Sequence, residues 1–114
     1  MKIPEEAELV RIFISEDDKW GHKPLYEAIV EEARKHGMAG ATVLKGCLGF
    51  GAGSRIHSAK VLMLSEELPR VVEIVDGPER IKEFIPVLDG MLKGGGLITL
   101  EKIRVITYKS PAEK

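Results

Sequence analysis

The order in which two hydrophobic periods alternate along this sequence restricts its fold more than any other feature. Segments with a two-residue period predict strands, and segments with apolar residues every three or four positions predict helices. In chain order the predicted elements are strand 8–15, helix 24–36, strand 41–47, a loop extension at 60–64, strand 70–75, helix 78–93 and strand 98–108. This order folds most simply as one antiparallel sheet with both helices on one face, the βαββαβ ferredoxin-like arrangement of the α+β class.

Proline and glycine mark the expected helix ends. Pro24 stands where a first helical turn tolerates proline, and Gly37 follows the last residue of the first helical pattern. Pro86 lies inside the second pattern and predicts a kink there. Three consecutive glycines, 94–96, then end the second helix.

The first predicted strand has apolar residues on both of its faces. Val10, Ile12 and Ile14 alternate with Leu9 and Phe13. Helices cover one face of a four-stranded sheet, so the second face needs another surface to bury against. Oligomerisation provides that surface most simply, and the alternative is that the long loop folds back over the face.

The stretch CLGFGAGSRIHSAK, residues 47–60, predicts a flexible loop at about 48–59. It is longer than a hairpin requires, rich in glycine, and contains Arg55 but no acid. From residue 33 to residue 65 there is no Asp or Glu and there are five Lys or Arg, so the rest of this chain of net charge −1 is acidic. We expect the loop to meet an anionic ligand.

Composition excludes several classes of function. A chain of 114 residues predicts one domain, 1–114, with a short polar tail at 109–114. The net charge of −1 gives no reason to expect nucleic acid as a partner, and the absence of a long apolar window or leader predicts a cytoplasmic protein. The lone Cys47 predicts a small buried side chain and no disulfide or metal cluster. The lack of Asn and Gln beside 31% charged residues indicates a thermophilic source.

Several motifs resemble those of a known family, the trimeric PII nitrogen-regulatory signalling proteins. The motifs are GMAGATVLKGCLGFG at 37–51, LPRVVEIVDGPERI at 68–81 and GGGLITLEKIRVI at 94–106. DDKWGHKPLYEAIVEEAR, at 17–34, is similar to the widespread PII-like branch of unknown function. The resemblance therefore covers nearly the whole chain.

The resemblance implies a regulatory homotrimer that binds an adenine nucleotide, ADP, AMP or ATP, in its intersubunit clefts and requires no further cofactor. It also implies that the loop after the second strand contacts a protein partner, for which a membrane transporter is one candidate. By position, the residues that match or could replace the family's nucleotide contacts are Gly49, Gly51, Gly94, Gly95, Gly96, Arg104, Lys45, Arg55 and Lys93. Glycine lets backbone N–H groups approach an anion, and a guanidinium can hold a phosphate in bidentate fashion.

Departures from the family pattern change what the resemblance implies. Leu97 stands where the family has a lysine after the glycine turn, and Ile106 replaces a second basic residue. Ala52 and Gly53 stand in place of Arg-Gln after G-F-G, and the loop has no tyrosine. Sensing of 2-oxoglutarate and uridylylation are therefore not expected, and ADP or AMP should bind at least as well as ATP.

Three alternatives stay open at this point. A structural trimer similar to divalent-cation-tolerance proteins would have the same plan without a nucleotide. A small phosphate-handling enzyme would have to use His57 with Ser54 or Ser58, but no acid lies nearby to orient the histidine, so we expect no enzymatic activity. Trp20, two residues before His22, is either a packing anchor or a residue that stacks beside a ligand base.

Overall fold

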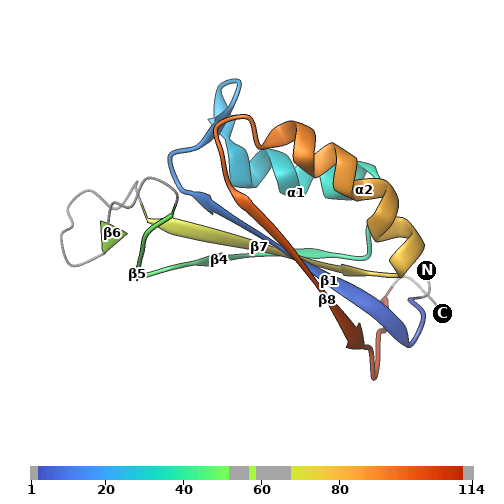
Figure 1. Ribbon diagram of the computed structural model, residues 1–114. Helices are drawn as coiled ribbons and strands as arrows, with labels where there is room; N and C mark the ends of the chain where they lie inside the picture. The colour runs from blue at the N-terminus through green and yellow to red at the C-terminus, as the bar shows by residue number, and fades with distance from the viewer. Residues whose placement is uncertain (1–2, 52–56, 59–67, 112–114) are drawn as a thin grey trace.

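A computed structural model of the protein describes residues 3–51, 57–58 and 68–111. Its elements in chain order are β1 (Glu6–Ser15), β2 (Lys19–Trp20), β3 (Lys23–Pro24), α1 (Leu25–Lys35), β4 (Ala41–Lys45), β5 (Leu48–Gly49), β6 (His57–Ser58), β7 (Pro69–Asp76), α2 (Pro78–Met91) and β8 (Leu97–Arg104). The main sheet has the antiparallel order β4-β7-β1-β8, and Figure 1 shows both helices on the same side of it. The predicted ferredoxin-like arrangement is confirmed.

The core lies between this sheet and the two helices. Val10, Ile12 and Ile14 of β1 point toward the helices and are at most 6% exposed. The helices bury an apolar face over them, which consists of Leu25, Ala28, Ile29 and Ala33 from α1 and Ile81, Phe84, Leu88 and Met91 from α2. Each large side chain removed from water in this way contributes about 1.5–3 kcal/mol, which fixes the helices on this face.

Helix α1 ends in a Schellman motif, as the position of Gly37 predicts. Gly37 has a φ of 70°, and its N–H donates to the carbonyl of Arg34 at 3.0 Å. The N–H of Met38 donates to the carbonyl of Ala33 at 3.0 Å. Glycine is favoured at this position because a Cβ is strained at positive φ, so the chain turns toward β4 here.

Several predicted boundaries are wrong. β1 begins at Glu6 rather than at 8, and β4 ends at Lys45 rather than at 47. β8 ends at Arg104 rather than at 108, because Glu6, the first residue of β1, pairs with Arg104 and offers no strand beyond it. The N–H of Val105 instead donates to the carbonyl of Glu5 at 2.8 Å. α2 ends at Met91 rather than at 93, and it runs on through Pro86.

Two short strand pairs were not predicted. β2 pairs with β3 in the connection between β1 and α1, and the turn between them contains Gly21 at a φ of 66°. β5 pairs with β6 at the base of the long loop. The extension expected at 60–64 and most of the loop expected at 48–59 lie outside the described residues.

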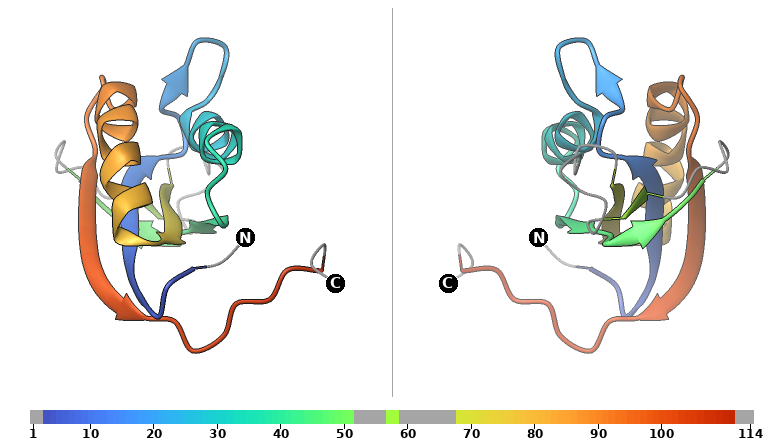
Figure 2. Two further views of the ribbon diagram at one scale, coloured as in Figure 1. Left: turned by 90° about the vertical axis from the view of Figure 1, so that its right-hand side faces the viewer. Right: turned by 90° about the vertical axis from the view of Figure 1, so that its left-hand side faces the viewer.

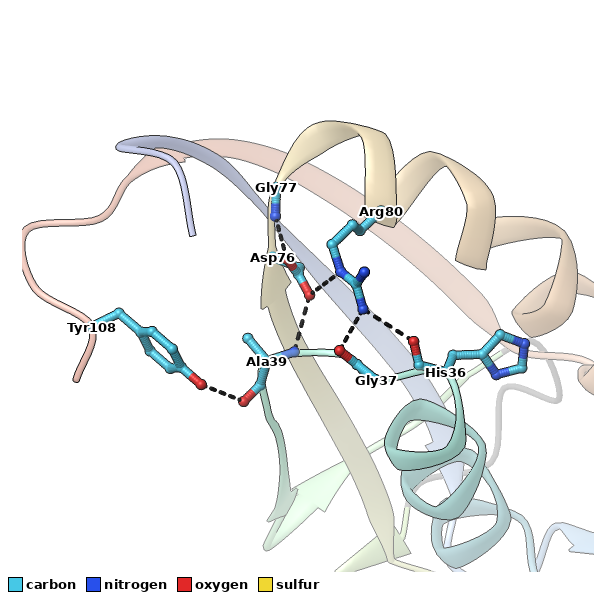
Figure 3. Close-up of polar contacts among 7 residues, drawn as sticks. All are labelled: His36, Gly37, Ala39, Asp76, Gly77, Arg80 and Tyr108. Atoms are coloured by element: carbon cyan, nitrogen blue, oxygen red, sulfur yellow. Dashed lines mark hydrogen bonds and ion pairs between the residues drawn. The ribbon is translucent and has the colours of Figure 1, made fainter. Parts of the chain in front are cut away.

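Asp76, at the end of β7, is fully buried. Among the described residues it is the one polar or charged residue that is buried. Its Oδ1 accepts a hydrogen bond from the N–H of Gly77 at 2.7 Å, and its Oδ2 accepts one from the N–H of Ala39 at 3.0 Å. The Nε of Arg80 donates to the same Oδ2 at 3.1 Å (Figure 3). One carboxylate therefore joins the end of β7, the start of α2 and the segment before β4.

Two further contacts extend this junction. Arg80 donates to the backbone carbonyls of His36 and Gly37, so its guanidinium also holds the end of α1. The hydroxyl of Tyr108 donates to the carbonyl of Ala39 at 3.1 Å. The segment after β8 thereby crosses from one edge of the sheet to the start of β4 at the other edge, as the end-on views of Figure 2 show.

We expect Asp76→Ala to lower the free energy of unfolding by about 2–4 kcal/mol, because two backbone N–H groups and one guanidinium lose their acceptor at a buried position. Chemical denaturation measures this difference. Glu83→Ala on the exposed side of α2 is the matched control and should change stability by less than about 0.5 kcal/mol. Equal stability of the two variants would contradict the role given to Asp76.

Candidate functional site

The four main strands define two ends of the sheet. At one, here called the loop end, lie Ser15, Lys45, Pro69 and Leu97, because Ser15 pairs with Pro69, Lys45 with Arg70 and Phe13 with Leu97. At the other, here called the tail end, lie Glu6, Ala41, Asp76 and Arg104. Most of the residues singled out from the sequence lie at the loop end.

Two glycines at the base of the long loop pack against one proline ring. A Cβ on Gly46 would lie 2.9 Å from Cγ of Pro69, and a Cβ on Gly49 would lie 3.1 Å from the same atom. The N–H of Gly46 also donates to the carbonyl of Pro69 at 2.8 Å. Gly49 therefore has a packing role besides any contact with a ligand, and Gly46, which the sequence places in a strand, is a second such position.

A carboxylate lies between two cations beside these glycines. Glu16 Oε2 forms an ion pair with Arg70 at 2.9 Å, and its Oε1 lies 3.9 Å from Nζ of Lys45, too far for a hydrogen bond. The guanidinium of Arg70 also lies 4.4 Å from the ring centre of Tyr26. Lys45 thus lies near an acid, and its contact with a phosphate stays a prediction.

The glycine turn before β8 is set by backbone geometry. Gly95 has a φ of 106° and Gly96 a φ of 151°, both strained for a residue with a Cβ. A Cβ on Gly96 would also lie 3.3 Å from the carbonyl oxygen of Phe13. The N–H of Gly95 donates to the carbonyl of Leu92 at 3.2 Å. The turn is compact and exposed, and it faces the loop end.

A pocket of about 310 Å³ opens between the β2–β3 hairpin and the end of α2. It is lined by Asp18, Lys19, Trp20, Gly21, Leu25, Met91, Lys93 and Gly94. Nζ of Lys93 lies 5.4 Å from the ring centre of Trp20. The pocket therefore combines an aromatic ring, a cation and the first residue of the glycine turn.

Arg104 lies at the tail end, far from the glycine turn of its own chain. β8 runs from Leu97 to Arg104, a length of roughly 25 Å at about 3.3 Å per residue. Arg104 Nε forms an exposed ion pair with Glu5 Oε2 at 2.7 Å. A single chain therefore does not bring Arg104 and the glycine turn together.

The two glycine-rich segments also lie apart within one chain. Gly49 and Gly51 follow β4, whereas the glycine turn precedes β8, and these two strands form opposite edges of the sheet. Three strand spacings separate those edges, about 14 Å. Gly51 is exposed, and Arg55 lies outside the described residues.

Within the described ranges, no group of three or more His, Cys, Asp or Glu side chains is placed to hold a metal ion. Cys47 is exposed, so the prediction that it is buried is wrong; it follows Gly46, where the chain leaves the sheet. None of the helices seen in the described residues has the length and apolar character to span a membrane.

Sequence comparison relates the chain to a known protein family. The model of the DUF190 family, described as an uncharacterized ACR, matches residues 7–105. A UPF0166 protein of Aquifex aeolicus (strain VF5) is 43% identical over 101 residues, which cover 89% of this chain and 94% of that protein. A UPF0166 protein of Methanocaldococcus jannaschii is 32% identical over 100 residues, which cover 88% and 92%.

Solved structures with the same fold come from PII-like proteins. CPII, a nitrogen regulatory PII-like protein from Thiomonas intermedia K12 bound to ADP, AMP and bicarbonate, has a TM-score of 0.67 at 13% identity and covers 88% of each chain. A putative PII-like signaling protein from Thermus thermophilus has a TM-score of 0.64 at 18% identity, covering 89% of this chain and 90% of that one. At these identities the likeness concerns the fold.

The packing at Pro69 leads to a test of the loop base. Gly46→Ala should lower the free energy of unfolding by about 1–3 kcal/mol, because the added methyl group overlaps a rigid ring in β7. Gly40→Ala is the control, since a Cβ there meets no atom within 4 Å. It should leave stability unchanged or raise it by up to about 1 kcal/mol. Thermal or chemical denaturation of both variants distinguishes a packed base from an open one.

Proposed function

Because the chain belongs to the DUF190 family and has the fold of PII-like proteins, we propose that it is a regulatory protein that binds an adenine nucleotide between subunits and contacts a partner protein through the loop after β4. CPII, which has this fold, is described as bound to ADP and AMP. The observation that carries the proposal is that two glycine-rich segments lie at the loop end but on opposite edges of the sheet. A second copy of the chain can bring the two edges together.

The proposed cleft is shared between chains for a geometric reason. Gly49 and Gly51 of one copy would meet Gly94, Gly95 and Gly96 of a neighbour, whose β8 edge lies beside the first copy's β4 edge. Within one chain, Arg104 and the glycine turn lie at opposite ends of β8. The Arg104 of the cleft would therefore come from another copy than the one that supplies the glycine turn. Glycine backbone and a guanidinium would then surround the phosphates without any catalytic group.

The face of the sheet opposite the helices supports assembly. The register places apolar side chains of all four strands on this open face, and they include Leu9, Phe13, Leu44, Val71, Val75 and Leu97. Phe13 is 39% exposed, Leu44 47% and Leu97 56%. Exposed apolar side chains from all four strands favour burial of this face against further copies. We propose a closed homotrimer, in agreement with the resemblance to trimeric PII proteins.

An ionic cluster interrupts the open face near its centre. Arg11 forms ion pairs with Glu73 at 2.9 Å and with Glu101. The hydrogen bond to Glu73, and to a smaller extent the one to Glu101, raises the pKa of Arg11, so its guanidinium stays charged. Arg11 is therefore paired within one chain and would not be a lone cation on a buried face.

The assembly proposal leads to a test on the open face. Phe13→Asp should convert the trimer to monomers at micromolar concentration, because a carboxylate on a buried apolar surface is strongly unfavourable. Sedimentation equilibrium measures the mass. Lys82→Asp on the exposed side of α2 is the control and should remain trimeric. A monomeric parent protein would contradict the proposed assembly, and a trimeric Phe13→Asp variant would contradict the assignment of this face.

The nucleotide proposal leads to a second test. ADP and AMP should bind at least as well as ATP, since Leu97 replaces a lysine beside the phosphates. Arg104→Ala should weaken ADP binding by roughly 1.5–3 kcal/mol, because a charge-assisted hydrogen bond to phosphate is lost. Isothermal titration calorimetry measures the affinities.

The controls separate this contact from general electrostatics. Arg34→Ala removes an exposed cation from the end of α1 and should bind ADP like the parent. Glu5→Gln frees Arg104 from its ion pair and should not weaken binding. If none of the three nucleotides binds at millimolar concentration, the nucleotide assignment fails and a structural trimer remains. If Arg104→Ala binds like the parent, the phosphate contact is wrong.

A further inference from the structure

The proposed function assigns contacts for the phosphates but leaves the pocket between the β2–β3 hairpin and α2 without a ligand. This pocket has a volume of about 310 Å³, which lies within the range of small-ligand sites. It contains Trp20, the one tryptophan of the chain. Gly94, the first residue of the glycine turn, lies at its rim. The pocket and the proposed phosphate contacts are therefore continuous.

We infer that this pocket takes the purine ring of the nucleotide. Trp20 stacks on the ring, Asp18 accepts a hydrogen bond from its amino group, and Lys93 pairs with the phosphate side of the ligand. This inference rests on the proposed function, which it deepens by naming the part of the ligand that each side of the pocket recognises.

The hairpin holds Trp20 in place at the surface. The indole is 38% exposed, so it is not committed to the core. Asp18 fixes both ends of the hairpin, because its Oδ2 accepts the N–H of Ser15 at 2.9 Å and its carbonyl accepts the N–H of Leu25 at 2.8 Å. An exposed aromatic ring on a rigid support is suited to stacking, since little freedom is lost on binding.

The polar groups of the pocket are of two signs. Asp18 Oδ1 makes no hydrogen bond to the described residues, so it can accept one from an amino group. Among the residues that the structure describes, the ammonium groups of Lys19 and Lys93 have no carboxylate partner. A ligand that complements this set has a flat ring with a donor at one end and negative charge at the other. An adenine nucleotide has both.

Lys93 does not block the ring. Its Nζ lies 5.4 Å from the centre of the indole, an exposed cation–π contact. Such contacts are generally weaker than the stacking of a base on an aromatic side chain. The flexible four-carbon stem of a lysine allows the ammonium to move from the ring to a phosphate when a base arrives.

The single tryptophan makes the test direct, because its fluorescence reports on this pocket alone. ADP should be titrated into the parent protein and followed by calorimetry and by tryptophan emission. We expect emission to change with the same affinity that calorimetry reports. Ribose 5-phosphate, which lacks the ring, should leave emission unchanged, and IDP, which has a carbonyl where adenine has its amino group, should bind more weakly.

Variants distinguish stacking from a structural role of Trp20. Trp20→Ala should weaken ADP binding by about 10-fold or more, while Trp20→Phe, which keeps an aromatic face, should stay within about 3-fold of the parent. If ADP binds by calorimetry but leaves emission unchanged, and if Trp20→Ala binds ADP like the parent while the parent binds IDP as well as ADP, the ring assignment is overturned and the proposed function stands. If ADP gives no binding heat with the parent, the proposed function itself fails, and the ring assignment fails with it.

Discussion

The central strand β1 has apolar side chains on both faces, but the two helices of the chain cover only one of these faces in the described structure. Val10, Ile12 and Ile14 are covered by α1 and α2, and this packing sets the sheet order and the positions of both helices. Leu9 and Phe13 face the other way, where the register adds apolar neighbours from β4, β7 and β8. This imbalance is the reason for expecting further copies of the chain, and it makes a shared ligand site possible.

The distribution of polar groups follows from the same sheet. An antiparallel sheet of order β4-β7-β1-β8 sends the long loop and the glycine turn to one end but to different edges. Arg104 then lies at the other end of the strand that begins beside the turn. In a single chain these groups lie at different ends or edges of the sheet, so a site built from all of them would need more than one copy. The Trp20 pocket is different because Trp20, Lys93 and Gly94 meet within one chain.

The sequence predicted those parts of the fold that depend on local periodicity. Val10, Ile12 and Ile14 mark β1, and Gly37 marks the end of α1, because strand alternation and helix capping act over a few residues. The β2–β3 hairpin was not predicted, since two-residue strands have no period to detect. Asp76 was missed because an acid after an apolar strand resembles a surface residue, and its burial depends on Ala39 and Arg80. Likewise, the sequence around Trp20 and around Lys93 does not indicate that the two side chains lie close together in the fold.

Pro69 holds both glycines at the base of the long loop, and this has a consequence for how such proteins diverge. The ring lies close to Gly46 and Gly49, and the Pro69 carbonyl closes the last hydrogen bond of the β4–β7 pair. The contacts that fix the base of the loop to the sheet are therefore all made before the loop begins. Insertions, deletions or exchanges beyond it leave the hydrogen bonds of the main sheet unchanged, so related chains can acquire different binding partners while they keep one scaffold.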